Sequence, residues 1–178
     1  MKQEFAIIDE WLPFEIHPDT PPQGVRWADY FPGMDHKAFF QQLDMRGRDL
    51  GARFGPQPLM SNSRAALEGG EFAKEHGSYD AYHEAIFRAF FIDCRDIGNR
   101  AVLLDVAGGV GLDTKALGAA LEARTYRPRL AETTRLARER WISSAPTFVV
   151  DGYGKITGAQ PIETFRAAFR EIEGKVQG

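Results

Sequence analysis

The stretch that decides the fold is Ser143-Ser144-Ala145-Pro146-Thr147-Phe148-Val149-Val150-Asp151-Gly152, followed by Ile156-Thr157-Gly158-Ala159-Gln160-Pro161. Residues 147–150 are β-branched or aromatic and predict a short buried strand, and Asp151-Gly152 is a hairpin signal. Pro146 can stand at the first position of a strand without breaking a hydrogen-bond ladder. Pro161 suits the first turn of a helix, where its missing N–H leaves no bond unmade. The pattern therefore predicts a loop, two short strands joined by a turn, and a helix.

The bulk composition is that of an ordinary globular protein, with 178 residues, 43% hydrophobic residues, 26% charged residues and a net charge of -3. This charge gives no indication of a nucleic-acid partner. No apolar run approaches the length of a membrane span, and the N-terminus does not open a signal peptide. We therefore expect a cytoplasmic protein with no membrane partner.

Cys94 is the single cysteine of the sequence, so an intramolecular disulfide and a cysteine-rich metal site are both excluded. The four histidines show no metal-ligand spacing, and we expect neither a metal site nor a cofactor. A lone cysteine could act as a nucleophile, but it would need a base and an orienting group, and no histidine is assignable as its partner. A small buried residue is the favoured interpretation of Cys94.

Hydrophobic periodicity divides the rest of the chain into one strand and a block of helices. Residues 4–16 are predicted to form an apolar strand, and residues 17–24 a polar loop. The predicted helices are 35–54 with Asp35 as N-cap, 63–76, 78–91, 101–107 capped by Asn99, 114–123 capped by Asp113, 128–141, and 162–172. The arginines between residues 124 and 140 are interpreted as a solvated face. Most of the helical block thus forms an insertion between strands at the two ends of the chain.

Leu103-Leu104-Asp105-Val106-Ala107-Gly108-Gly109-Val110-Gly111 resembles the glycine-rich loop of S-adenosylmethionine-dependent methyltransferases. That fold requires alternating strands and helices, whereas two predicted helices follow Gly111 before the next strand. The favoured interpretation is a helix that glycines terminate, and the methyltransferase is the least favoured function.

The opening stretch resembles the C-terminal part of DsbA-like thioredoxin-fold proteins, and the similarity is greatest to their FrnE-type branch. The further motifs that carry the resemblance are Gly158-Ala159-Gln160-Pro161, Pro13-Phe14-Glu15-Ile16-His17-Pro18-Asp19, and Arg95-Asp96-Ile97-Gly98 followed by Val102-Leu103-Leu104. The resemblance implies an α/β fold with a thioredoxin-like sheet and a large all-helical insertion. It assigns residues 1–24 and 143–178 to the thioredoxin-like portion and residues 35–142 to the insertion.

The resemblance also implies a substrate-binding site at Ser144, Ala145 and Pro146. In that family Pro146 would be a cis-proline, and the exposed backbone of Ala145 would pair with an extended substrate. The implied partner is a thiol- or disulfide-containing protein or small molecule, glutathione included. No chemistry of their own is assigned to Gly158, Ala159 and Gln160.

The catalytic C-x-x-C motif of that family is absent from these residues, so no catalytic residue is assigned. The resemblance begins at the second core strand, which implies N-terminal truncation, an unfilled position within the sheet and self-association of the chain. Three functions stay open: part of a dithiol–disulfide oxidoreductase that is inactive as this chain, a non-catalytic binding or assembly module, and a relative of the glutathione-dependent isomerases or transferases.

Overall fold

The computed structural model of the chain describes residues 1–48 and 51–176. The chain divides into two compact units, which we call the helical unit and the hairpin unit. The helical unit is His17–Glu132, and the hairpin unit joins Met1–Ile16 to Thr133–Gly178. Helix α7 (Arg127–Glu139) crosses the boundary between them. The division of the sequence into a thioredoxin-like portion and an insertion stays a prediction.

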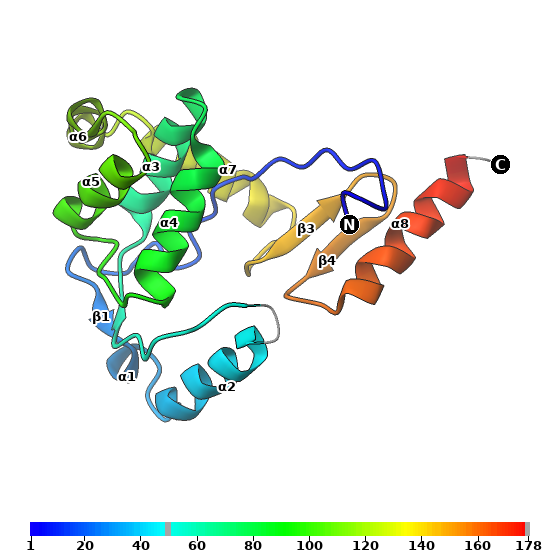
Figure 1. Cartoon of the computed structure of the whole chain (residues 1–178), viewed down its shortest axis with the longest axis horizontal. Coiled ribbons are helices and arrows are strands. Elements are labelled where there is room, and N and C mark those ends of the chain that lie inside the picture. Colours follow the sequence, from blue (N-terminus) through cyan, green and yellow to red (C-terminus); the bar gives the residue numbers. More distant parts are fainter. Residues whose placement is uncertain (49–50, 177–178) are drawn as a thin grey trace. The chain divides into compact units, whose positions relative to one another are not determined.

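The helical unit contains two very short strands and most of the helices (Figure 1). Its elements before α7 are β1 (Val25–Arg26), α1 (Trp27–Tyr30), α2 (His36–Arg48), β2 (Leu59–Met60), α3 (Arg64–Glu75), α4 (Tyr79–Phe91), α5 (Arg100–Gly109) and α6 (Thr114–Ala123). Strands β1 and β2 pair in antiparallel fashion, with Val25 opposite Met60. The sequence did not predict β1, β2 or α1, because elements of two to four residues carry no periodicity.

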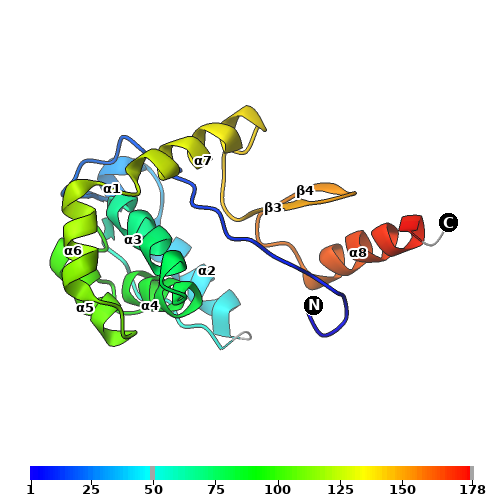
Figure 2. The same cartoon turned by 90° about the horizontal axis from the view of Figure 1, so that it is seen from above.

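Helices α3 to α6 pack on one another around a shared apolar core (Figure 2). Large side chains of this core include Phe72, Tyr82, Leu103, Leu117 and Tyr126. Helices α3 to α6 begin within one residue of where the sequence predicts. The Asn99 side chain accepts a hydrogen bond from the Ala101 N–H, and that of Asp113 accepts from two N–H groups of α6. The glycine-rich stretch is the end of helix α5, as the favoured interpretation predicted.

The predicted end of the helix beginning at residue 35 is wrong. The Asp35 carboxylate accepts a hydrogen bond from the Ala38 N–H at 2.9 Å, so the predicted N-cap is confirmed. Helix α2 is described over His36–Arg48, residues 49–50 of the prediction lie outside the described residues, and residues 52–54 are not helical. Gly51 has a φ of +74°, a left-handed conformation that an α-helix does not contain.

The arginines of α7 are exposed or half-buried, as predicted, but two of them also pair with buried carboxylates of α3, which the sequence did not reveal. Two glutamates of α3, Glu68 and Glu71, are each about 1% exposed. Arg127 Nε donates to Glu68 Oε1 at 2.7 Å, and Arg129 Nε lies 2.6 Å from Glu71 Oε2. A buried carboxylate requires such a partner because its desolvation is costly. Periodicity along α7 cannot reveal these partners, because they belong to another helix.

The hairpin unit contains β3 (Thr147–Val150), β4 (Gly154–Thr157) and α8 (Ile162–Val176). The two strands pair in antiparallel fashion, with Thr147 opposite Thr157 and Val150 opposite Gly154, so residues 151–153 form the turn. The ring of Phe148 meets that of Phe165 on α8 edge-on, with 4.9 Å between centroids. The predicted order of strand, turn, strand and helix is confirmed.

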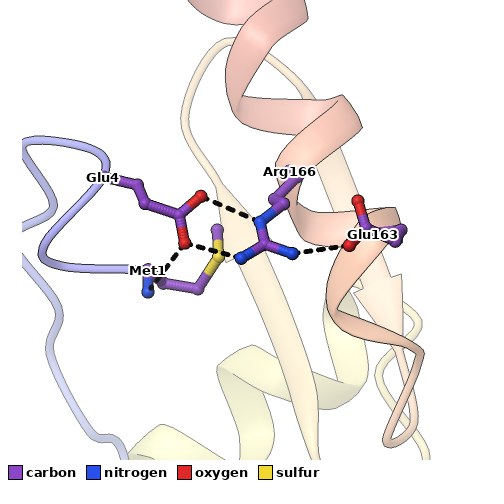
Figure 3. A network of polar contacts seen from close by, with 4 residues as sticks. All are labelled: Met1, Glu4, Glu163 and Arg166. Atoms are coloured by element: carbon purple, nitrogen blue, oxygen red, sulfur yellow. Dashed lines mark hydrogen bonds and ion pairs between the residues drawn. The ribbon is translucent and has the colours of Figure 1, made fainter.

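Residues 4–16 do not form the predicted strand. A strand exists only through pairing with a neighbour, and the two described sheets are β1 with β2 and β3 with β4. Side chains hold the segment instead. Arg166 on α8 binds both carboxylate oxygens of Glu4, at 2.8 and 2.7 Å, and also Glu163 (Figure 3). Further along, the Glu15 N–H donates to Thr134 Oγ1 at 3.1 Å.

Strand β3 is also less buried than predicted. Phe148 is 38% exposed and Val149 is 52% exposed. The reason is the number of neighbours: within the described residues β3 pairs only with β4, so one of its edges is open. A run of β-branched and aromatic residues indicates strand propensity but not how many neighbours a strand has.

Candidate functional site

Ser144, Ala145 and Pro146 lie together in the bend that leads into β3, as the sequence places them. The peptide bond between Ala145 and Pro146 is cis. Ala145 and Pro146 are exposed, and Ser144 is half-buried. The bend is therefore open to a ligand, and what it offers that ligand is chiefly main chain.

The direction of the hydrogen bonds around Pro146 determines which backbone groups face the open edge. The Pro146 carbonyl accepts a hydrogen bond from the Gly158 N–H at 2.8 Å. In an antiparallel pair, residues alternate between those bonded to the neighbouring strand and those facing away. Pro146, Phe148 and Val150 thus face β4. The N–H and C=O groups of the alternate residues, Thr147 and Val149, face the open edge.

Ala145 continues this open edge by one more residue. No backbone hydrogen bond joins it to any residue within 1–48 or 51–176. A row of unpaired N–H and C=O groups is a template for an additional strand. An extended chain could therefore pair with the backbone N–H and C=O groups of Ala145, Thr147 and Val149, which all lie on this edge.

Short hydrogen bonds fix the shape of the bend. The Thr147 hydroxyl donates to the Ser144 carbonyl at 2.7 Å. From β4, Lys155 Nζ donates to the Arg140 carbonyl at 2.8 Å, just beyond the C-terminal end of α7. A lysine is favourable there because a helix C-terminus carries partial negative charge. The bend is therefore held from both of its ends.

Gly158 and Gln160 have a structural role that the sequence did not reveal. Gly158 has a φ of +82°, and its N–H bonds the Pro146 carbonyl. The side-chain amide of Gln160 donates to the Thr157 carbonyl at 2.8 Å. These residues keep the chain beside Pro146 as β4 ends. The register of the hairpin would have predicted the Gly158–Pro146 contact, since it continues the pairing of Thr157 with Thr147 by one residue.

Cys94 lies in the helical unit and has the wrong environment for a nucleophile. It is half-buried, which is more exposed than predicted, because it follows α4 in a turn where its φ is +52°. Burial, assisted by the nearby Asp93, raises the pKa of its thiol. A raised pKa lowers the thiolate fraction at neutral pH, and the thiolate is the reactive form.

Within the described part of the chain, no cluster of three or more His, Cys, Asp or Glu side chains could hold a metal ion. None of the described helices is both long enough and apolar enough to cross a membrane.

Comparison with known proteins identifies the family. A model of the DSBA-like thioredoxin domain matches residues 8–170. The chain belongs to the DSBA-like thioredoxin domain family. The uncharacterized protein YwbO of Bacillus subtilis (strain 168) is 31% identical over 174 residues, which cover 93% of this chain and 82% of YwbO.

Among solved structures, the chain is similar to the probable DsbA oxidoreductase SCO1869 from Streptomyces coelicolor. The TM-score is 0.81 and the identity 25%, over 90% of this chain and 73% of that one. The thioredoxin-like DsbA fold predicted from the sequence is thereby confirmed. The family match and the structural similarity together make this chain a relative of thiol–disulfide oxidoreductases.

Proposed function

We propose that this DSBA-like domain binds an extended, cysteine-containing polypeptide by adding it as a strand beside Ala145, and that these 178 residues perform no dithiol–disulfide exchange themselves. The observation that carries the proposal is the backbone of Ala145, which has no backbone hydrogen bond to a described residue, is exposed next to Pro146 and is in line with the open edge of β3. Main-chain hydrogen bonds supply the affinity in this mode of recognition.

The absence of exchange chemistry from these residues follows from the cysteine count. Dithiol exchange needs one thiolate that attacks and a second thiol that resolves the mixed disulfide. The sequence has one cysteine, and burial raises the pKa of its thiol. These residues therefore contribute binding of the substrate backbone, the part of the family's function that requires no thiol.

The test uses a fluorescein-labelled eight-residue peptide of alternating Val and Thr with a central S-methylcysteine, which can pair as a strand but cannot react. We expect saturable binding by fluorescence anisotropy. The same peptide with its alternate amides N-methylated should not bind, because it has lost the N–H groups that pair with a strand. Equal binding of the two peptides would refute strand addition.

A matched pair of variants localises the binding. Val149→Pro removes an N–H that faces the open edge and leaves the bonds to β4 in place, as edge strands tolerate. Losing one net hydrogen bond weakens binding by about threefold to tenfold. Val149→Thr keeps the N–H and should bind within about twofold of the parent.

A separate assay tests the lack of exchange chemistry. The Cys94→Ser protein should reduce insulin disulfides no faster than buffer alone does. Robust reduction of insulin would contradict the proposal.

A further inference from the structure

The helical unit contains a cavity separate from the bend at Ala145. Its volume is about 770 Å³, within the size range of small-molecule sites. Three segments line it: the end of β1 with the start of α1, the length of α2, and Phe54 with residues 56–58, which lead toward β2. All three belong to the same compact unit, so the walls are positioned together.

The floor of the cavity is aromatic. Trp27, Phe40 and Phe54 line it, with Pro56 and Pro58 beside them. The rings of Trp27 and Phe40 meet edge-on with centroids 5.7 Å apart. Aromatic walls favour a flat apolar body, which can pack face to edge against them. The prolines contribute apolar surface without an N–H that a ligand would leave unsatisfied.

The rim of the cavity carries an excess of positive charge. Arg26 is bound by Asp29, at 2.8 and 2.7 Å, and Arg48 is bound by Asp44. Lys37, exposed on α2, has no carboxylate within 4 Å among the residues that the structure describes. One uncompensated ammonium beside an apolar floor is complementary to a ligand with one negative group.

Two of the residues that line the cavity carry a buried nitrogen atom without a hydrogen-bond partner among the described residues. Trp27 Nε1 and His36 Nδ1 are buried, and neither has a hydrogen-bond partner in the described parts of the chain. The indole N–H can only donate, and buried donors nearly always have an acceptor. Both nitrogen atoms are inaccessible from the cavity, so they do not select its ligand.

We infer that the cavity between α1, α2 and residues 54–58 binds a small aromatic monoanion, with its rings on Trp27, Phe40 and Phe54 and its negative group toward Lys37. This site is independent of the strand addition proposed for Ala145. Its ligand class follows from the combination of aromatic lining residues and an uncompensated cation.

Two probes with the same aromatic body separate the charge from the apolar contact. The first is 8-anilinonaphthalene-1-sulfonate, a monoanion, and the second is N-phenyl-1-naphthylamine, which lacks the sulfonate. Fluorescence titration of the whole chain should show saturable binding of both, with the sulfonate tighter by about twofold to fivefold, the contribution of one exposed ion pair. Equal affinity, or tighter binding of the neutral probe, would overturn the inference.

Three variants locate the site. Lys37→Met should weaken the sulfonate by about twofold to fivefold and leave the neutral probe unchanged. Lys115→Met, an exposed lysine of α6 in the same unit, is the matched control and should change neither. Gln41→Phe adds bulk at an exposed position of the cavity lining, tolerable for folding, and should weaken both probes. Unchanged binding by the Gln41→Phe protein would mean that the probes bind elsewhere, and would overturn the inference.

Nuclear magnetic resonance gives a second readout that does not depend on affinity. The chain has three tryptophans, hence three indole N–H signals, and Trp27→Phe assigns the relevant one. The sulfonate probe should shift the Trp27 signal and leave the signals of Trp11 and Trp141 in place. A shift confined to Trp11 or Trp141 would refute the site. Sedimentation velocity that shows Gln41→Phe dissociating a dimer, with no change in probe binding, would show that a second copy occupies the cavity instead.

Discussion

The two units of this chain differ in where they place apolar side chains. In the helical unit, α3 to α6 enclose a continuous core that includes Leu103 and Leu117, both 0% exposed. In the hairpin unit, the buried apolar residues among those described are Pro13, Ile156 and Ala168. Large apolar side chains there are exposed instead: Ile8, Trp11, Leu12, Ile16, Leu136, Trp141, Phe148, Val149, Tyr153 and Ile162.

The difference follows from how each kind of element satisfies its backbone. A helix bonds its own N–H and C=O groups, so helices adjacent in sequence can close a core among themselves. A strand depends on a neighbour for both its hydrogen bonds and its cover, and β3 has one described neighbour. The open edge of β3 and the exposure of Phe148 and Val149 therefore both follow from its having one described neighbour.

The same substitution made in each unit is the strongest way to break this comparison. Leu103→Ala should lower the free energy of unfolding by about 2–5 kcal/mol, because it leaves a cavity in a closed core. Leu12→Ala, at a side chain that is 60% exposed, should change it by less than about 0.5 kcal/mol. Urea denaturation followed by far-ultraviolet circular dichroism measures both. Comparable losses would mean that Leu12 is covered in solution.

Helix α7 allows a second comparison, because it crosses both units. Arg127→Met removes the partner of buried Glu68, and we expect a loss of about 2–3 kcal/mol, below the value for a fully buried pair because Arg127 is 37% exposed. Arg135→Met on the same helix removes an exposed pair with Glu139 and should cost about 0.3–0.5 kcal/mol. Thermal and urea unfolding of the two variants measure both losses in the free energy of unfolding, and so their ratio. Equal losses would show that burial of Glu68 does not matter.

The smallest expected effect concerns how the N-terminal segment is held in the hairpin unit. The hydrogen bonds from Arg166 lower the pKa of Glu4 below its ordinary value of 4.5. A lowered native pKa means that this contact stabilises the fold above the unfolded pKa, and is lost as the pH falls through the native pKa. Arg166→Gln should raise the pKa of Glu4 toward 4.5 in a carbon-13 titration of its carboxyl group, and Asp29, whose pKa Arg26 lowers, serves as control. An unchanged Glu4 titration would contradict the pairing.

Local signals in the sequence predicted much of the helical unit and the hairpin. Capping residues such as Asn99 and Asp113 act within three residues of themselves, so they place helix starts without any tertiary information. Asp151-Gly152 places the turn of the hairpin in the same way, and the motif around Pro146 locates the bend of the candidate site. These features depend on contacts between residues that are near in sequence.

Tertiary structure decided what depends on distant partners. Residues 4–16 have an apolar composition suited to a strand, but strand formation needs a neighbouring strand, and their contacts are side-chain contacts to α7 and α8. The arginines of α7 form a solvated face as predicted, and only the tertiary structure shows that α3 places Glu68 and Glu71 against two of them. Within residues 143–150, the sequence by itself determined the bend at Pro146 and the strand that follows it. The open edge, with Ala145 unpaired, depends on which strands lie beside β3, and no residue within 143–161 encodes that number.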